Sequence, residues 1–158
     1  MTRHYGRAVK KNRVNDSAPL NTPVTTTVLS SIRLNGETVH ITYPGGTTGN
    51  QFVEYLNNYL IPCLHQGDIV VMDNMRSHHV EDVSKCLEAA GMSLLYLPPY
   101  SPDLNPIEEM WSKLKAILRH SKIRVASQLS AAVDTAFQAI RNSDCRGWFS
   151  LCGYTCVN

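Results

Sequence analysis

The sequence predicts an α/β fold, and three observations lead to this prediction. Residues 25–43 have the pattern of an antiparallel β-hairpin, in which β-branched residues flank an Asn35-Gly36 turn. Segments with strand and helix spacing then alternate along the chain. The apolar run 68–73 ends in Asp73, at the strand end where open α/β sheets place polar functional groups. With 43% hydrophobic residues, a chain of 158 residues can form one domain with a sizeable core.

The elements that follow the hairpin are predicted from apolar spacing and from breaker residues. Pro44-Gly45-Gly46 ends the second hairpin strand. Apolar residues then recur at helical spacing over residues 52–64, which predicts a helix that crosses over to the strand at 68–73. A second helix is predicted over residues 80–90, and a short strand over 93–97.

The last third of the chain predicts two further helices. Asn105 is a favourable N-cap, and Pro106 takes the preferred first position of a helix that extends to Leu118. Ser127 is the predicted N-cap of a final helix that ends near Ile140. We expect the large side chains near the chain end to pack back onto the core, namely Trp148, Phe149, Leu151 and Tyr154.

Charge is strongly segregated along the chain, although the net charge is only +2. Residues 34–112 contain ten acids and two basic residues, whereas ten of the fifteen basic residues lie in two flanking patches. This pattern suits a polyanion that is held at its edges, with a solvated helix face and a basic tail as the alternative. The predicted phosphate contacts are Arg3, Arg7, Lys10, Lys11 and Arg13 in the first patch and Lys113, Lys115 and Arg119 in the second.

Several protein classes are disfavoured by composition. No apolar run approaches the roughly 20 residues of a membrane span, and the N-terminus lacks the apolar segment of a secretory signal, so we expect a cytoplasmic protein, nucleoid-associated if the host is bacterial. Five cysteines without a Cys-x-x-Cys pair predict buried free thiols. A zinc site formed by three of them with His120 is conceivable, but its spacing matches no recurrent module.

Two acids from different elements could form a metal site. Asp73 ends a strand, and the Pro-rich segment 97–106 leads to Glu108 at the start of a helix. The 34 residues between the two acids are enough for one helix and one strand. Carboxylates gathered in this way suit Mg²⁺, which prefers oxygen ligands and takes waters and substrate phosphates as its remaining ligands.

Each of these assignments has an alternative. Asn-x-x-Glu from Asn105 to Glu108 resembles a capping box, so Glu108 could simply cap its own helix. Glu109 competes with Glu108 for the role of ligand, and Asp73 could be a strand-end acid. His78 could assist proton transfer or orient a ligand, or it could be a solvent-facing residue at a helix start.

The same residues resemble a known family. Val71-Met72-Asp73-Asn74 with His78, the segment LPPYSPDLNPIE at 97–108, and the following Trp111-x-x-Leu114-Lys115 closely resemble the catalytic domain of insertion-sequence transposases of the Tc/mariner superfamily. Tyr5-Gly6-Arg7 and the terminal Trp148-Phe149 also look like that family, so the resemblance covers nearly the whole chain.

The resemblance implies a ribonuclease H-like mixed sheet flanked by helices over residues 25–158, preceded by a basic arm and loop at 1–24. It implies a DDE acidic triad that binds Mg²⁺ or Mn²⁺ and cuts and rejoins DNA ends. Asp73 matches the second acid and Glu108 the third. Asn74 and His78 match flanking residues of the family motif, and the Pro-rich loop is expected to hold the glutamate helix in position.

In the family, the first acid lies on a central strand upstream of the Tyr-Gly-Arg segment, and a helix-turn-helix DNA-binding region precedes it. We therefore expect this chain to lack the first acid and the central strand, because Asp16, the first acid here, lies in a predicted loop. Metal binding should then be weak, and another chain could supply the missing N-terminal part. The alternatives are a non-catalytic DNA-binding remnant or regulator of transposition, and a plain metal-dependent nuclease.

Overall fold

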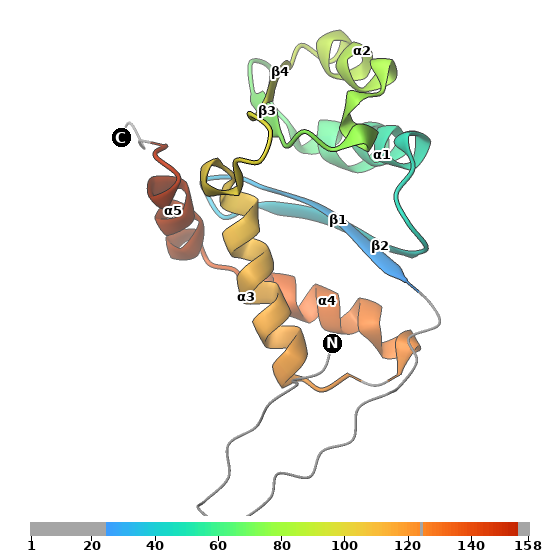
Figure 1. The fold of residues 1–158 in the computed structure, drawn as a ribbon, viewed down its shortest axis with the longest axis vertical. Coiled ribbons are helices and arrows are strands. Elements are labelled where there is room, and N and C mark those ends of the chain that lie inside the picture. Colours follow the sequence, from blue (N-terminus) through green and yellow to red (C-terminus); the bar gives the residue numbers. More distant parts are fainter. Residues whose placement is uncertain (1–24, 124, 155–158) are drawn as a thin grey trace, which may run out of the picture.

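A β-hairpin lies at the centre of the molecule, with helices on both of its faces (Figure 1). In this computed structural model, which describes residues 25–123 and 125–154, the hairpin consists of β1 (Thr26–Ile32) and β2 (Thr38–Pro44). The two strands pair antiparallel, as predicted from the Asn-Gly turn. Gly36 has a φ of +92° in that turn, and a Cβ there would lie 3.0 Å from the backbone of Asn142. The turn therefore requires glycine for both backbone freedom and space.

The first core packs on one face of the hairpin. It begins with α1 (Gly49–Tyr55), which continues as a π-helical turn η1 (Leu56–Leu60) and a 3₁₀ turn η2 (Ile61–Cys63). The predicted helix over 52–64 thus starts earlier, because Thr48 and Gln51 form a capping box. Its end changes hydrogen-bonding pattern near Pro62, which has no N–H to donate to an α-helical ladder.

The same core contains a small parallel sheet and a second helix. Its further elements are β3 (Ile69–Met72), the 3₁₀ turn η3 (Arg76–His79), α2 (Glu81–Ala89) and β4 (Ser93–Tyr96). β3 and β4 pair in parallel, as a strand, a crossover helix and a strand normally do. The buried side chains of this core are Phe52, Tyr55, Leu56, Leu60, Met72, Val83, Leu87 and Met92.

The second core packs on the opposite face of the hairpin. Its elements are the 3₁₀ turn η4 (Pro102–Leu104), α3 (Pro106–His120), η5 (Ala126–Gln128), α4 (Leu129–Gln138) and α5 (Asn142–Leu151). Val28 and Ile32 of β1 pack here, whereas Leu29 between them packs against the first core. The alternation of β1 side chains therefore serves both cores. The buried side chains of the second core are Met110, Leu114, Val133, Ala136 and Phe137.

Three local predictions were wrong or incomplete. Gln128, not Ser127, is the N-cap of α4, because η5 adds a turn before the helix. Leu151 is 72% exposed rather than packed on the core, because it lies in α5, a separate helix that the apolar pattern did not predict. Trp148 of the same helix does pack against the second core, as expected. Among the cysteines, Cys145 and Cys152 are buried, but Cys63 is exposed.

The strands form two separate two-stranded sheets within the described part of the chain. β1 pairs only with β2, and β3 only with β4. One face of the β3–β4 sheet also exposes Ile69, Val71 and Leu95. Among the described residues, no helix is long and apolar enough to cross a membrane.

α5 is fixed to α3 by an ion pair that also caps a helix. Lys113 Nζ lies 2.5 Å from Asp144 Oδ2, and the same oxygen accepts a hydrogen bond from the backbone N–H of Arg141 at 2.8 Å. The hydrogen bond from Lys113, followed by that of the Arg141 backbone, lowers the pKa of Asp144 below the ordinary value of 3.8. The carboxylate therefore stabilises the folded state in its ionised form.

This pair predicts a pH-dependent stability difference. Asp144→Asn should reduce the free energy of unfolding near neutral pH by about 1–2 kcal/mol, because a charge-assisted hydrogen bond is lost. Since the pKa is lowered in the folded state, this contribution is complete above 3.8 and is lost as pH falls through the folded-state pKa. Urea denaturation over a pH series measures the difference. Asp82→Asn, in the first turn of α2, is the control and should cost less; equal costs, or a cost for Asp144→Asn that is independent of pH, would contradict the assignment.

Candidate active site

Asp73 directly follows β3, where the backbone N–H of Leu97 donates to the carbonyl of Met72 at 2.8 Å. The Asp73 side chain is 39% exposed. Its Oδ1 accepts a hydrogen bond from the backbone N–H of Met75 at 3.2 Å and lies 2.8 Å from Nδ1 of His78. No described residue donates a hydrogen bond to the other carboxylate oxygen, Oδ2. Asp73 is thus held through one oxygen only.

Glu108 lies in the first turn of α3, at the end of the Pro-rich loop. The loop starts at the buried Leu97 and tightens into the 3₁₀ turn η4, and Asn105 then takes the N-cap position of α3. At the other end of the chain, the hydroxyl of Tyr154 donates to the carbonyl of Leu104 at 2.9 Å. Hydrogen bonds therefore hold the loop both at its start, Leu97, and near its end, Leu104, just before the helix that contains Glu108.

The structure gives no support to the capping interpretation of Glu108. Asn105 occupies the N-cap position, but its side chain makes no capping hydrogen bond. The carboxylate of Glu108 likewise makes no hydrogen bond or ion pair with any described residue, although its backbone N–H donates to Asn105 at 3.0 Å. The exposed carboxylate is favoured only by the positive end of the α3 dipole, an interaction typically worth about 0.3–1 kcal/mol.

Asp73 and Glu108 line the same pocket, which has a volume of about 500 Å³. Glu109, the competing acid, is not among its lining residues. The wall between the two acids is formed mainly by the Pro-rich loop, with Leu97, Pro98, Pro99, Tyr100, Ser101, Pro102 and Asn105. The strand-tip acid and the helix-start acid therefore line one pocket.

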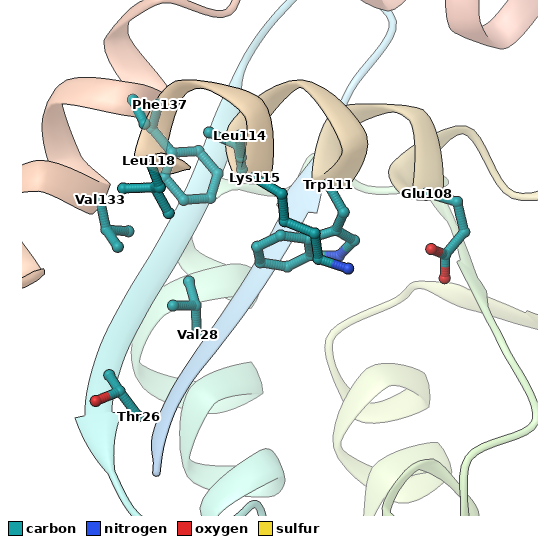
Figure 2. Close-up of a pocket in the computed structure, with 10 residues that line it drawn as sticks. Thr26, Val28, Glu108, Trp111, Leu114, Lys115, Leu118, Val133 and Phe137 are labelled. Carbon is teal, nitrogen blue, oxygen red and sulfur yellow. The ribbon is translucent and has the colours of Figure 1, made fainter. Parts of the chain in front are cut away.

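A second, more apolar groove of about 350 Å³ continues from Glu108 along α3 (Figure 2). It lies between α3, α4 and β1, and the side chains of Trp111 and Lys115 lie between those of Leu114 and Glu108 in this view. Glu108 belongs to both pockets, so the groove and the acidic pocket adjoin at this side chain.

The donor set suits a divalent ion only in part. Within residues 25–123 and 125–154, no group of three or more His, Cys, Asp or Glu side chains is placed to hold a metal ion. The pocket instead offers one free oxygen of Asp73 and the unpaired carboxylate of Glu108. Such a set fits an ion that retains several waters or phosphate oxygens, as Mg²⁺ commonly does.

The accessory residues from the motif have different surroundings. His78 contacts Asp73, whereas the side-chain oxygen of Asn74 contacts Nε2 of His79, whose ring stacks on Tyr96 with centroids 4.3 Å apart. Asn74 nevertheless lines the pocket. Tyr100, at the loop tip, has a φ of +58°, and a positive φ is rare for an aromatic residue. Its side chain is fully exposed.

The predicted phosphate contacts are only partly described. Arg3, Arg7, Lys10, Lys11 and Arg13 lie outside the described residues. On α3, Lys113 is engaged with Asp144, while Lys115 and Arg119 are exposed. The Nε of Arg119 donates to the carbonyl of Lys115 at 2.9 Å. Lys115 also lines the groove that adjoins the acidic pocket at Glu108.

Comparisons with known proteins agree with the motif. The sequence model of a family described as DDE superfamily endonuclease matches residues 1–130. The Tcb1 transposase of Caenorhabditis briggsae is 35% identical over 68 residues, which is 43% of this chain and 25% of that protein. The matched stretch is therefore a small part of that relative.

Solved structures of the Mos1 transposase share the fold. The Mos1 paired-end complex with the left transposon end superposes with a TM-score of 0.72 at 20% identity, over 94% of this chain and 47% of that chain. The catalytic domain of Mos1 mariner transposase gives a TM-score of 0.59 at 18% identity, over 80% of this chain and 74% of that domain. This chain thus spans about half the length of the Mos1 chain in the complex, and the predicted ribonuclease H-like fold class is confirmed. Because the family model covers most of the sequence, the chain belongs to the DDE superfamily endonuclease family.

Proposed function

We propose that Asp73 and Glu108 together bind a divalent metal ion, Mg²⁺ or Mn²⁺, and act in the cleavage and rejoining of DNA ends of a mobile element. The observation that supports this function most directly is the single pocket lined by both carboxylates. Two of the Mos1 structures are described as containing Mn and Mg, and the Mos1 complexes contain transposon-end DNA or are strand-transfer complexes. Those ligands are properties of Mos1 and support the proposal by analogy.

The chemistry follows from what the two carboxylates can supply. A divalent ion in this pocket would polarise a phosphate oxygen and lower the pKa of a bound water or hydroxyl. Asp73 and Glu108 contribute two negative charges, so phosphate groups of the substrate would complete the coordination. We therefore expect weak metal binding in the free chain and stronger binding with DNA present.

Binding of a divalent ion is predicted to require both pocket acids. Asp73→Asn and Glu108→Gln should each weaken Mn²⁺ binding by about tenfold or more, because each removes one of two ligand charges. Electron paramagnetic resonance of free Mn²⁺ during a titration of the full chain measures the affinity directly. Glu109→Gln is the matched control, since Glu109 also lies in the first turn of α3 but does not line the pocket.

Two results would contradict this metal assignment. One is Mn²⁺ binding that is unchanged in Glu108→Gln, and the other is an equal loss in Glu109→Gln. Urea denaturation provides the second control, because both glutamates lie in the first turn of α3 and neither side chain makes a hydrogen bond or ion pair with a described residue. Their substitution should therefore change the free energy of unfolding by similar amounts, within about 0.5 kcal/mol of the parent. A large destabilisation by Glu108→Gln only would restore the capping interpretation.

DNA binding is proposed to use the basic residues on either side of the acidic middle of the sequence. On α3 these include the exposed Lys115 and Arg119, and the basic residues on the other side lie among positions 1–24 of the sequence. The alternative function, a non-catalytic DNA-binding remnant, is favoured because, among the described residues, Asp73 and Glu108 are the only acids that line the pocket. The two functions share the basic surface and differ only in metal-dependent chemistry.

Salt dependence and cleavage distinguish these two functions. For duplex terminal-repeat DNA, a plot of log affinity against log salt has a negative slope. Lys115→Gln should make this slope shallower by about one, because one phosphate contact is lost. Fluorescence anisotropy over a salt series measures that slope, and Lys122→Gln, further along the chain, provides a comparison. Metal-dependent nicking that disappears in Asp73→Ala would support catalysis. Binding without nicking by any metal-loaded form would support the remnant, and a salt slope unaffected by Lys115→Gln would contradict this DNA-binding surface.

We further propose that a strand from a separate chain pairs with the free edge of β1 and fills the adjoining groove. Three features support this proposal. β1 and β3 each have only one hydrogen-bonded neighbour among the described residues. The groove beside β1 is lined mainly by apolar side chains from three elements. The outer face of the β3–β4 sheet exposes Ile69 and Leu95, which in a stable sheet are normally covered.

Hydrogen exchange tests the added strand. In the chain alone, amides of β1 that point away from β2 should exchange rapidly. When the chain is co-expressed with the segment encoded directly upstream of Met1, these amides should become protected, because a new ladder satisfies them. Amides in the middle of α4 are the internal control and should not change. Equal protection of β1 with and without the upstream segment, or the lack of a complex, would contradict the proposal.

A further inference from the structure

His78 contacts Asp73 through one ring nitrogen. Its Nδ1 lies 2.8 Å from Asp73 Oδ1 and 3.3 Å from the backbone carbonyl oxygen of the same residue. Both neighbours are hydrogen-bond acceptors, so a lone pair on Nδ1 would face two oxygen lone pairs. Nδ1 must therefore have a proton, and this N–H donates to Asp73.

The imidazole ring itself is held in place by the first core. The side chain of His78 is only 14% exposed, and its ring packs on Phe52 of α1 with centroids 4.3 Å apart and an interplanar angle of 34°. Phe52 is buried, and its position is set by the packing of α1 against the rest of the core. The ring has therefore little freedom to turn Nδ1 away from Asp73.

The backbone of His78 is restrained as well. The hydroxyl of Tyr96, at the end of β4, donates to the carbonyl of His78 at 2.5 Å. The N–H of His78 donates to the carbonyl of Met75 at 2.9 Å within the turn that leads to η3. Contacts from α1 and β4 thus converge on one histidine, and through it on the acid at the tip of β3.

The consequence concerns the two oxygens of Asp73. Oδ1 is engaged by His78 Nδ1 and by the backbone N–H of Met75, whereas Oδ2 has no donor among the described residues. We propose that His78 is a positioning residue, whose Nδ1–H holds Asp73 Oδ1 so that Oδ2 is the oxygen presented to a divalent ion. The inference rests on the proposed metal site and adds a residue that acts through Asp73 rather than on the metal.

Two substitutions of His78 distinguish the contribution of its Nδ1–H donor from that of its ring packing. His78→Phe keeps an aromatic ring against Phe52 but removes the N–H, and His78→Asn loses the ring but places an amide N–H close to the position of Nδ1. If His78 positions Asp73, His78→Phe should weaken Mn²⁺ binding by about tenfold to a hundredfold, the range found when an outer hydrogen-bond partner of a metal ligand is removed. His78→Asn should recover most of that loss. Thermal unfolding of the metal-free chains measures any structural effect separately.

A role in folding alone predicts the opposite order. The ring would then matter more than the donor, so His78→Asn would lower both the unfolding midpoint and the Mn²⁺ affinity, while His78→Phe would retain both. This result would overturn the positioning role. Unchanged Mn²⁺ affinity in both variants would also overturn it.

A measurement without metal distinguishes failure of this inference from failure of the proposed metal site. Long-range ¹H–¹⁵N correlation spectra of histidine-labelled chain report which ring nitrogen is protonated. We expect a proton on Nδ1 of His78 in the parent, and loss of the hydrogen-bonded Nδ1–H signal in Asp73→Ala. A neutral ring with its proton on Nε2 alone would refute the inference whether or not the chain binds Mn²⁺. A protonated Nδ1 in a chain that binds no Mn²⁺ would instead refute only the metal site.

Discussion

The acidic pocket depends on a stiff connection between two separately packed layers of the molecule. Asp73 belongs to the layer that contains α1, α2 and the β3–β4 sheet, and Glu108 belongs to the layer that contains α3 and α4. The β1–β2 hairpin lies between these layers (Figure 1). The Pro-rich loop crosses from one layer to the other, and its prolines limit the backbone angles that it can adopt. A flexible loop would have to be ordered each time the acids meet, at a cost of about 1–2 kcal/mol per residue.

Electrostatics explains why the two acids need different kinds of support. Asp73 is partly exposed and is stabilised by two hydrogen-bond donors on one oxygen. Glu108 is exposed and has only the N-terminus of α3 near it. Neither carboxylate is paired with a lysine or arginine among the described residues, whereas Asp68 and Asp144 are paired with Arg33 and Lys113. Asp68 and Asp144 thus have cationic partners, whereas each pocket acid keeps at least one oxygen without a donor among the described residues.

Local sequence patterns predicted the parts of the fold that depend on neighbouring residues. The hairpin, the strand that ends at Met72 and the start of α3 at Pro106 follow from turn chemistry, apolar runs and the position of a proline. The common pocket of Asp73 and Glu108 also agrees with their expected places at a strand end and a helix start. Both acids follow from the sequence pattern and from the motif resemblance, whereas the residues that line the pocket with them are seen only in the structure.

Features that depend on contacts distant in sequence could not be predicted in this way. The apolar pattern does not reveal that Phe52 packs on the ring of His78, 26 positions later, or that Lys113 pairs with Asp144. The exposure of Leu151 and the separate helix α5 likewise depend on how the chain end meets α3. The separation into two sheets depends on which strands find hydrogen-bonding partners, and no local pattern records this.

The central claim is that Asp73 and Glu108, from two different layers, act on one ion. Anomalous X-ray diffraction from crystals soaked in Mn²⁺ tests it most directly, because the anomalous signal locates the ion without assumptions about activity. We expect a peak in the pocket lined by the Pro-rich loop, with one oxygen of Asp73 and the carboxylate of Glu108 both at a coordination distance of about 2.0–2.2 Å. An Mn²⁺ peak bound by one of these acids alone, or at another acidic cluster with this pocket empty, would contradict it.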